Sequence, residues 1–505
     1  MSHLVIDDVA VEELARAEGV CARPIVKSVT DRLNGETVWV PLPCGATRDV
    51  VCPACAAKAR RLRMTQCLEG WHLDTEPEVP ELTSAADEDP PAEDEETVGD
   101  EIAPVRQTRS TRRPESMPSL PFVPVENRTI GRAFTGKEGR TYRPSMFVTL
   151  TLPSYGAVVP GRGVPVTPAK YDYRRAALDA LLFPRLIDRW VQNLRRCAGY
   201  KVQYFGAVEA QVRLAPHFHV ALRGAIPRKV IQQVTRATYA SVWWPPFDRV
   251  VYRSTPPVWD GADYVDPDTS APLRSWEQAL DALGDDARPA HTLRFGRQLD
   301  IQGLLGGSTE SDRAVRYLTK YLTKAVAETY AVGADPAYEA HIDRLHRHVR
   351  WLPCSPECAN WLRYGVQPKN PGPGLAPGRC PSRSHDREHL GVGGRRVLVS
   401  RGWSGKTLSQ HRADRATVVR ELLESAGITP PEATRMAAEV LDQDGEPRFL
   451  WSLATVPPHI AGNYVMNAVM ERRRWRAELD LAKSLVTPGA PPVDNHSAAP
   501  ATGGE

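Results

Sequence analysis

The stretch "GAVEAQVRLAPHFHVALRG", residues 206–224, predicts a β-hairpin that carries polar side chains on one face. His217 and His219 are separated by one residue, so on a strand both imidazoles project from the same face, about 7 Å apart along the chain. If Gln211 lies opposite His217, then Glu209 lies opposite His219. That register places all four side chains on a single face of the hairpin.

Two imidazoles and a carboxylate or amide oxygen form a mixed nitrogen and oxygen site. Such a site suits Mn²⁺ or Mg²⁺ and leaves open positions for a phosphate. We therefore expect a catalytic divalent ion held by His217 and His219, with Glu209 as the third ligand. The alternative is that these polar residues line the solvated face of a sheet.

A second motif, "AVRYLTKYLTKAV" at residues 314–326, repeats Tyr-Leu-Thr-Lys within a helix expected over 311–331. At about 100° per residue, the two phenols and two ammonium groups of this repeat fall within one arc of roughly 100°, and the leucines point to a separate arc. These polar heads belong to Tyr317, Lys320, Tyr321 and Lys324. A phenol with a pKa of about 10 is a poor nucleophile at neutral pH. Beside a divalent cation that polarises a phosphate it can attack phosphorus, while lysines stabilise the developing charge. The alternative is an amphipathic helix with ordinary interfacial tyrosines.

The surrounding pattern predicts an α+β fold in the order β-α-ββ-α-β-α, which favours an antiparallel sheet with helices on one face. Alternating segments indicate the strands, and amphipathic segments indicate the helices. The strands are expected at 145–152, 202–211, 217–224 and 290–301. The helices are expected at 173–197, interrupted by Pro184, at 227–244 and at 311–331.

Nine cysteines in a chain with no secretory signal favour metal binding or free thiols over disulfides. The early group resembles a structural zinc site with four thiolates, from Cys21, Cys44, Cys52 and Cys55. Because the spacing from Cys21 to Cys44 is wide, Cys67 or His72 could replace one of these ligands.

The late group predicts a second zinc site, with three thiolates and an imidazole, in a Gly- and Pro-rich segment that lacks a core of its own. Its members are Cys354, Cys358, Cys380 and His385. A closed four-ligand site leaves no open position, so we expect about two structural Zn²⁺ ions per chain and a catalytic role for neither. Buried free thiols are the alternative for both groups.

The composition describes a globular chain of 505 residues that is 42% hydrophobic and 25% charged. Its net charge of +3 conceals an asymmetry, because residues 74–101 hold 13 Asp and Glu and no Lys or Arg. The rest of the chain therefore carries a net charge of +16. An Arg-rich surface is expected for a partner that bears phosphates. A nucleotide-composition bias toward Arg, Ala and Pro codons is the alternative.

The changes in composition along the chain predict six segments. These are a Cys-rich zinc module at 1–73, a disordered acidic then basic linker at 74–140, the catalytic core at 141–335, the Cys₃His zinc segment at 336–412, a helical C-terminal region at 413–485 and a disordered tail at 486–505. No stretch predicts a signal peptide or a membrane span, so we expect a cytoplasmic protein.

Several motifs together resemble the HUH endonuclease superfamily, and within it the replication initiator proteins of actinobacterial plasmids and integrative elements. The matching stretches are "CPACA", "FVTLTLPSYG", "FGAVEAQVRLAPHFH", "HTLRFGRQ", "YLTKYLTK", "RYGVQPKNPGPG" and "GRRVLVSRGWSGKTL". They run from about Cys21 to Thr407, and the acidic insert at 74–101 is the departure. The resemblance implies an HUH-type antiparallel sheet with helices packed on it, flanked by zinc-binding modules and a C-terminal helical region.

The activity that the resemblance implies is the initiation of rolling-circle replication of a plasmid. Site-specific, metal-dependent nicking of origin DNA would leave a 5′-phosphotyrosine and a free 3′-hydroxyl primer, and the same chemistry would rejoin the strand. The residues implied are the metal ligands His217, His219 and Glu209 and the nucleophile Tyr317. The paired tyrosines are also similar to those of initiators from small single-stranded DNA phages, which use both. The partners implied are origin DNA, single-stranded at the nick, and host helicase and DNA polymerase, with no membrane.

Three alternatives stay open. An HUH-type two-tyrosine transposase shares the tyrosine helix and the motif order. A conjugative relaxase usually places its tyrosine before the His motif, whereas here the tyrosine follows it by about 100 residues, which argues against a relaxase. A non-enzymatic zinc-binding regulator that binds DNA or RNA would carry the His pair incidentally.

Overall fold

The structure is a computed structural model that describes residues 8–71, 73, 77, 118–130, 134–135, 137, 139, 141–142, 144–284, 287–305, 309–320, 335–393, 396–425, 440–443 and 445–486. The chain divides into two compact units, residues 63–407 and residues 1–62 with 408–505, and each is described by itself. The expected linker at 74–140 and the expected tail at 486–505 lie largely outside the described residues. Their disorder, and the other segment boundaries, stay predictions.

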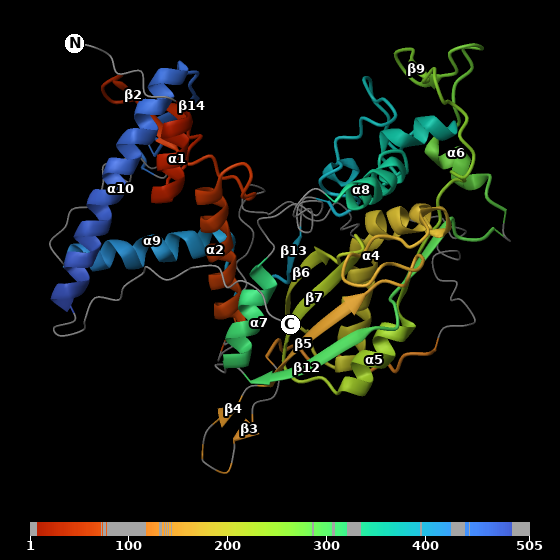
Figure 1. Cartoon of the computed structure of the whole chain (residues 1–505), viewed down its shortest axis with the longest axis horizontal. Coiled ribbons are helices and arrows are strands. Elements are labelled where there is room, and N and C mark those ends of the chain that lie inside the picture. Colours follow the sequence, from red (N-terminus) through yellow and green to blue (C-terminus); the bar gives the residue numbers. More distant parts are fainter. Residues whose placement is uncertain are drawn as a thin grey trace. The chain divides into compact units, whose positions relative to one another are not determined.

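The unit of residues 63–407 is built on one antiparallel sheet in the strand order β12-β5-β7-β6-β13 (Figure 1). In that order the strands span Leu299–Leu305, Pro144–Thr151, Pro216–Arg223, Tyr204–Ala210 and Val397–Val399. β6 and β7 form the predicted hairpin, and β5 is the strand expected at 145–152. The mixed fold of helices and an antiparallel sheet is therefore confirmed.

One face of the sheet carries the main hydrophobic core. Side chains alternate along a strand, and Phe218 and Val220 of β7 point into this core. The helices that contribute to it include α4 (Tyr173–Ala198), α5 (Arg228–Ala237) and α8 (Pro336–Val349) (Figure 1). The helices bury one side of β7 completely.

The opposite face carries a smaller core. Phe147 and Phe205 pack there with Leu318 of α7 (Thr309–Thr319) and with the C-terminal end of α2 (Pro53–Trp71). Helices therefore lie on both faces of the sheet, and the expectation of helices on one face is wrong. The physical reason is that large apolar side chains of β5 and β6 point to this second face and need cover of their own.

Two helix predictions differ from the structure. α4 runs unbroken through Pro184, because its 15 buried residues compensate for the roughly 3 kcal/mol that an internal proline costs. The helix expected over 227–244 ends at Ala237 as α5 and is followed by a strand, β8 (Tyr239–Val242). Pairing of β8 with β11 (His291–Arg294) stabilises the extended form of those residues.

The strand expected over 290–301 is also two strands. β11 pairs with β8 in a separate two-stranded sheet, whereas β12 joins the main sheet beside β5. The residues between them include Gly296, where an added Cβ would lie 2.8 Å from the carbonyl oxygen of Leu152. The close approach of two backbones at this point breaks the single strand into two.

The unit of residues 1–62 and 408–505 joins distant parts of the sequence in one sheet. β1 (Ile25–Asp31) pairs on one side with β2 (Thr37–Leu42) and on the other with β14 (Phe449–Leu453), both antiparallel. The pairing of β1 with β14 links segments more than 400 residues apart, which no local sequence pattern predicts.

Among the described residues, three helices lie wholly within this second unit, and α2 begins in it. α1 (Asp8–Glu18) packs on α10 (Pro458–Val486) through Val11 and Val465, and α9 is Leu408–Ser425 (Figure 1). The expected helical region at 413–485 therefore contains helices and also strand β14.

Shorter elements complete the described chain. They are β3 (Phe134–Thr135), β4 (Thr141–Tyr142), β9 (Val258–Trp259), β10 (Tyr264–Val265), α6 (Trp276–Asp281) and the 3₁₀ helices η1 (Pro168–Lys170), η2 (Ala359–Tyr364) and η3 (Arg383–His385). Of the helices in the described ranges, none is both apolar enough and long enough to cross a membrane.

Candidate functional site

The predicted metal ligands come together on the face of the sheet that α7 covers. Glu209 lies on β6, and His217 and His219 lie on β7. The Nε2 atoms of the two imidazoles are 3.1 Å apart, and each lies 3.7 Å from Oε2 of Glu209. One metal ion could therefore contact all three side chains.

The register of the hairpin differs from the expected one. Glu209, and not Gln211, pairs with His217. Gln211 begins the turn, where its backbone N–H donates to the carbonyl of Ala215 at 2.8 Å and its side-chain oxygen accepts from Arg213. The expected pairing is wrong because the chain reverses in a tight turn that starts at Gln211, where the backbone N–H of Leu214 donates to the carbonyl of Gln211 at 2.8 Å. The difference is two residues along one strand, so the three ligands still share a face.

Burial sets the charge state of the three ligands. It raises the pKa of the Glu209 carboxyl to about 7, and it lowers the pKa of His217 to about 4 and of His219 to about 3. Both imidazoles are therefore neutral near pH 7, which is the form that binds a metal ion. Oε1 of Glu209 is buried and has no hydrogen-bond partner within the described ranges. An orphaned carboxyl oxygen beside two neutral imidazoles is a donor set that fits a divalent cation.

Two residues of β5 position His219, and the sequence motifs do not identify either of them. Thr149 pairs with His219 across the sheet, and its Oγ1 lies 2.9 Å from Nδ1 of the imidazole. A hydrogen bond at Nδ1 leaves Nε2 to face the other ligands. Phe147 stacks on the same ring with the centroids 6.0 Å apart. The signal in the sequence is the alternation of "FVTLTL", which puts both side chains on one face.

Tyr317 lies at the cluster of ligands. It belongs to α7, which packs onto the sheet through the buried Leu318. Its hydroxyl lies 3.4 Å from Nε2 of His219, and the two rings are perpendicular with their centroids 4.8 Å apart. Phe147 packs edge-on against the same tyrosine. Tyr317 remains 40% exposed, so a substrate can reach its side chain.

The rest of the repeated motif is only partly described. Lys320 follows α7 in an exposed turn. Burial raises the pKa of Glu209 and is the largest effect on it, whereas the positive charge of Lys320 lowers that pKa. The lysine is therefore close enough to the predicted ligands to act on them electrostatically. Tyr321 and Lys324 lie outside the described residues, as does most of the second half of the expected helix. The common arc of the four polar heads therefore stays a prediction.

The early cysteine group lies together as expected, with the thiols of Cys21, Cys44, Cys52 and Cys55 in one cluster. The Sγ atoms of Cys21 and Cys52 are 3.8 Å apart. Zinc–sulfur bonds of about 2.3 Å in a tetrahedron separate two sulfurs by about 3.8 Å, so the spacing fits zinc. Cys67 is buried in the smaller core of the sheet unit, and His72 lies outside the described residues.

The late group, Cys354, Cys358, Cys380 and His385, is also assembled. The Sγ atoms of Cys354 and Cys380 are 3.9 Å apart, and Nε2 of His385 lies 3.5 Å from Sγ of Cys358. Nδ1 of His385 donates to the carbonyl of Val349 at 2.7 Å, which leaves Nε2 to face the thiols. Hydrogen bonds from Cys354 and Cys358 lower the pKa of Cys380, and the thiolate is the form that binds zinc.

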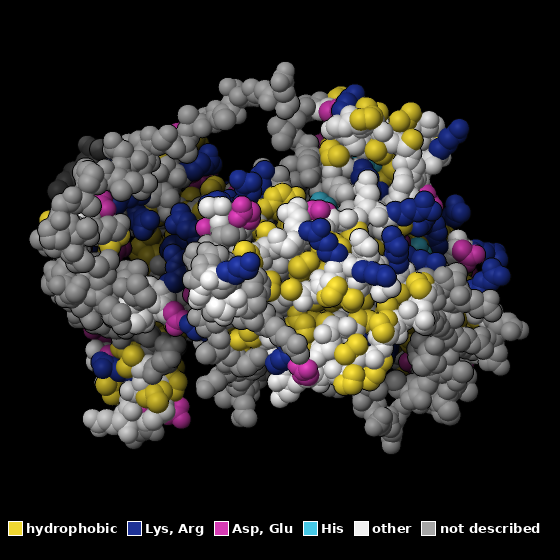
Figure 2. All heavy atoms as spheres, turned by 90° about the horizontal axis from the view of Figure 1, so that it is seen from below, with side chains coloured by type: hydrophobic (Ala, Val, Ile, Leu, Met, Phe, Trp, Pro, Cys, Tyr) yellow, Lys and Arg dark blue, Asp and Glu magenta, His cyan; other side chains and the backbone are white. Residues whose placement is uncertain are grey.

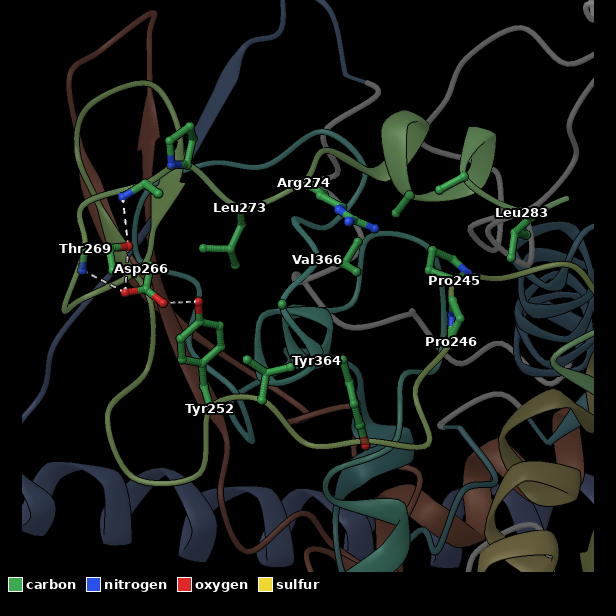
Figure 3. Close-up of a pocket in the computed structure, with 16 residues that line it drawn as sticks. Pro245, Pro246, Tyr252, Asp266, Thr269, Leu273, Arg274, Leu283, Tyr364 and Val366 are labelled. Atoms are coloured by element: carbon green, nitrogen blue, oxygen red, sulfur yellow. Dashed lines mark hydrogen bonds between the residues drawn. The ribbon is translucent and has the colours of Figure 1, made fainter.

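A cavity of about 530 Å³ opens elsewhere in the same unit, and none of the predicted site residues lines it (Figure 3). Its wall is largely apolar, and Arg274 contributes a positive charge. Asp266 accepts hydrogen bonds from the hydroxyl of Tyr252 at 2.7 Å and from the backbone and hydroxyl of Thr269. These contacts give Asp266 a structural part in its loop.

The fold and the grouped ligands define the chain as a candidate metalloprotein with a tyrosine at one metal cluster and cysteines at two others. Comparison with known families gives a match to the family described as "Replication initiator protein, pSAM2" over residues 8–454. The chain belongs to this replication initiator family, and the family prediction is confirmed.

One curated relative supports the same assignment. The chain is 28% identical over 247 residues to a replication initiator protein of Streptomyces ambofaciens, which covers 41% of this chain and 49% of that protein. The matched part thus spans about half the length of the relative. No solved structure gives a significant match.

Proposed function

We propose that this chain initiates plasmid replication by cutting one strand of origin DNA. Tyr317 is the nucleophile, and Glu209, His217 and His219 hold a divalent ion, Mg²⁺ or Mn²⁺. The observation that carries the proposal is the position of the Tyr317 hydroxyl, 3.4 Å from Nε2 of His219. In a member of a replication initiator family, an exposed tyrosine beside three metal-type ligands supports strand cleavage.

The reaction is a transesterification at phosphorus. The Tyr317 oxygen forms a bond to phosphorus and loses its proton to solvent, while the bond from phosphorus to the 3′-oxygen breaks. The 3′-oxygen takes a proton from solvent, so the products are a 5′-phosphotyrosine and a 3′-hydroxyl. A divalent ion at the site supplies positive charge to a phosphate oxygen. Lys320 adds charge from the end of α7, and we assign the same part to Lys324 and a second nucleophilic part to Tyr321.

The charge of the surface supports a polyanionic partner. On the face that Figure 2 shows, Lys and Arg side chains are more widespread than Asp and Glu among the described residues. Arg313 and Arg316 are exposed on α7, the helix that carries Tyr317. We propose that origin DNA binds along α7, as a single strand at the nick. The 3′-hydroxyl would then prime host DNA polymerase behind a host helicase, in the cytoplasm.

The two cysteine groups would hold structural Zn²⁺. Each offers four ligand atoms to one ion, so neither leaves an open position for substrate. Their part in the function is to stabilise the turn-rich segments that contain them.

The alternatives share some of these features. A two-tyrosine transposase would use the same ligands and the same tyrosine, but the family match favours the initiator. A regulator without enzymatic activity has no need of a tyrosine hydroxyl beside a buried His-His-Glu cluster, and so explains less of the site.

The test is a nicking assay with single-stranded origin DNA and with supercoiled plasmid that carries the DNA flanking the gene, over a range of Mn²⁺ concentrations. The double variant His217→Ala/His219→Ala should fold and fail to nick. His496→Ala, in the expected tail, is the control and should nick normally. Nicking by the double variant at the wild-type rate at every Mn²⁺ concentration would place the metal site elsewhere. Maintenance of a plasmid that carries only this gene and its flanking DNA separates an initiator from a transposase.

A further inference from the structure

One end of α8 contacts the turn of the hairpin that bears the ligands. Tyr338 donates a hydrogen bond from its hydroxyl to the carbonyl of Val212 at 2.9 Å, and Nε2 of His341 lies 3.4 Å from the carbonyl of Arg213. Nδ1 of His341 lies 3.0 Å from the hydroxyl of Tyr173 on α4. The buried imidazole can thus accept from Tyr173 while it donates to Arg213, which ties the turn to two helices.

That turn connects the strand of Glu209 to the strand of His217. It comprises residues 211–215, and the backbone of Gly163 packs closely against it. A Cβ at Gly163 would lie 2.4 Å from the carbonyl oxygen of Val212. Because α8 is hydrogen-bonded to this closely packed turn, a movement of α8 would shift the turn and would change the spacing of Glu209 and His217.

The other end of α8 contacts the late cysteine group. The carbonyl of Val349 accepts from Nδ1 of His385 at 2.7 Å, and Nε2 of His346 lies 3.1 Å from the carbonyl of His385. Arg387, two residues after His385, also forms ion pairs of 2.6 Å with Glu339 in the first turn of the helix and of 2.8 Å with Asp343 in its middle. Thus His385 touches both the thiols and the helix.

The helix between these ends is a rigid connector. From His341 to Val349 it rises by about 12 Å. Ile342 and Leu345 are buried in the main core, so this stretch is packed along its length. A closely packed helix of this length moves as one body, and a displacement at one end reaches the other.

We propose that the late cysteine group, when it holds zinc, positions the catalytic hairpin through α8. The affinity of the Glu209, His217 and His219 site for a divalent ion then depends on the late site. The inference rests on the proposed function for the identity of the two sites. Tyr338 and His341 are positioning residues, because they act on the ligands through the turn.

The first test compares two cysteine variants that each remove one zinc ligand. Cys380→Ser should lose about one zinc per chain, bind Mn²⁺ about tenfold more weakly by electron paramagnetic resonance, and exchange amide hydrogens faster over residues 204–223. Cys44→Ser, in the early group, should also lose about one zinc. Its Mn²⁺ affinity and its exchange over the turn 211–215 should match those of the wild type, because the contacts described for that turn come from α8 and Gly163 and not from the early group.

The second test leaves every zinc ligand in place. Tyr338→Phe deletes only the hydroxyl that holds Val212, and Tyr364→Phe deletes a matched hydroxyl, which donates to the carbonyl of Trp351 at 3.2 Å. Tyr338→Phe should raise the Kd for Mn²⁺ about tenfold and slow nicking at low Mn²⁺, with the rate restored by excess Mn²⁺. Tyr364→Phe should do neither.

The outcomes separate the coupling from the function on which it rests. Wild-type Mn²⁺ affinity and wild-type exchange in Tyr338→Phe would overturn the coupling, whether or not Cys380→Ser folds. Failure of the proposed function has another signature, since the wild-type protein would bind Mn²⁺ at the hairpin and still not cut origin DNA. In that case the exchange difference between the variants would still report the coupling.

Discussion

Glu209 lies directly opposite His217 on the neighbouring strand, with 3.7 Å between Oε2 of the carboxyl group and Nε2 of the imidazole. With His219 two residues further on, all three candidate ligands come from the 11 residues 209–219. The hairpin by itself thus brings the ligands together. The rest of the unit contributes burial, the orientation of His219 and the hydroxyl of Tyr317.

Replacement of Glu209 by Gln should weaken the divalent site and preserve the fold. The amide has the same shape but no charge, and hard divalent cations bind carboxylates more strongly. We expect Mn²⁺ affinity, measured by calorimetric titration, to fall by at least about tenfold and nicking to fall with it. Glu277→Gln, on the exposed surface of α6, is the control. Wild-type affinity in Glu209→Gln would remove Glu209 from the site.

Replacement of Thr149 by Val should act through His219. The change keeps the shape of the side chain but removes the oxygen that lies 2.9 Å from Nδ1 of the imidazole. Loss of such an orienting contact typically costs 10- to 100-fold in metal affinity, and we expect a loss in that range by Mn²⁺ titration. Thr292→Val removes a hydroxyl that contacts Ser241 at 2.9 Å, outside the candidate site, and should leave Mn²⁺ affinity unchanged. Equal affinities in the two variants would show that Thr149 does not orient the ligand.

Purified protein should contain about two zinc ions per chain without added metal, because two groups of four ligand atoms are assembled. Elemental analysis measures this content. Cys354→Ser and Cys21→Ser should each reduce it to about one, whereas Cys197→Ser, outside both groups, should retain about two. A zinc content near zero in folded, active protein would show that the thiols have another role.

The parts of the site that the sequence predicts are those set by local periodicity. Residues two apart on a strand share a face whatever lies around them, so the grouping of His217 with His219 follows from the pattern alone. Glu209 lies on the neighbouring strand and joins them only because the pairing register has the right parity. The pairing of Gln211 with His217 is wrong because the backbone hydrogen bonds of the turn that starts at Gln211, and not the alternating pattern, fix the register. A difference of two residues preserves the face, which is why the ligand set is unaffected.

The parts of the fold that the sequence does not predict depend on distant segments. β13 joins β6 from nearly 200 residues away, and β14 joins β1 from more than 400 away. No local periodicity specifies such partners, because a strand pattern shows only that a segment is extended and not what it pairs with. Thr149 is missed for the same reason, since its contact with His219 crosses between two strands that lie about 70 residues apart.

The repeated tyrosine motif leads to a prediction about the order of events in replication. On the proposed mechanism, a full round needs two transesterifications, one to open the origin and another to release the displaced strand. The first leaves one tyrosine bonded to DNA and no longer nucleophilic. A second tyrosine four residues along the chain, Tyr321, could then attack in its turn, with Lys320 and Lys324 as the two matching cations.

If the tyrosines alternate, Tyr317→Phe and Tyr321→Phe should each retain some single cleavage and lose termination and repeated rounds. The competing explanation is that Tyr317, whose hydroxyl lies 3.4 Å from His219, is the sole nucleophile and Tyr321 only packs. A suicide oligonucleotide that traps the covalent adduct, followed by mapping of the modified peptide, separates the two. An adduct on Tyr321 in the Tyr317→Phe variant supports alternation, because it shows that Tyr321 can itself attack the phosphate. If that variant forms no adduct and Tyr321→Phe completes replication, one tyrosine performs both steps. The second strand transfer must then wait until that tyrosine is released from its bond to DNA after the first cleavage.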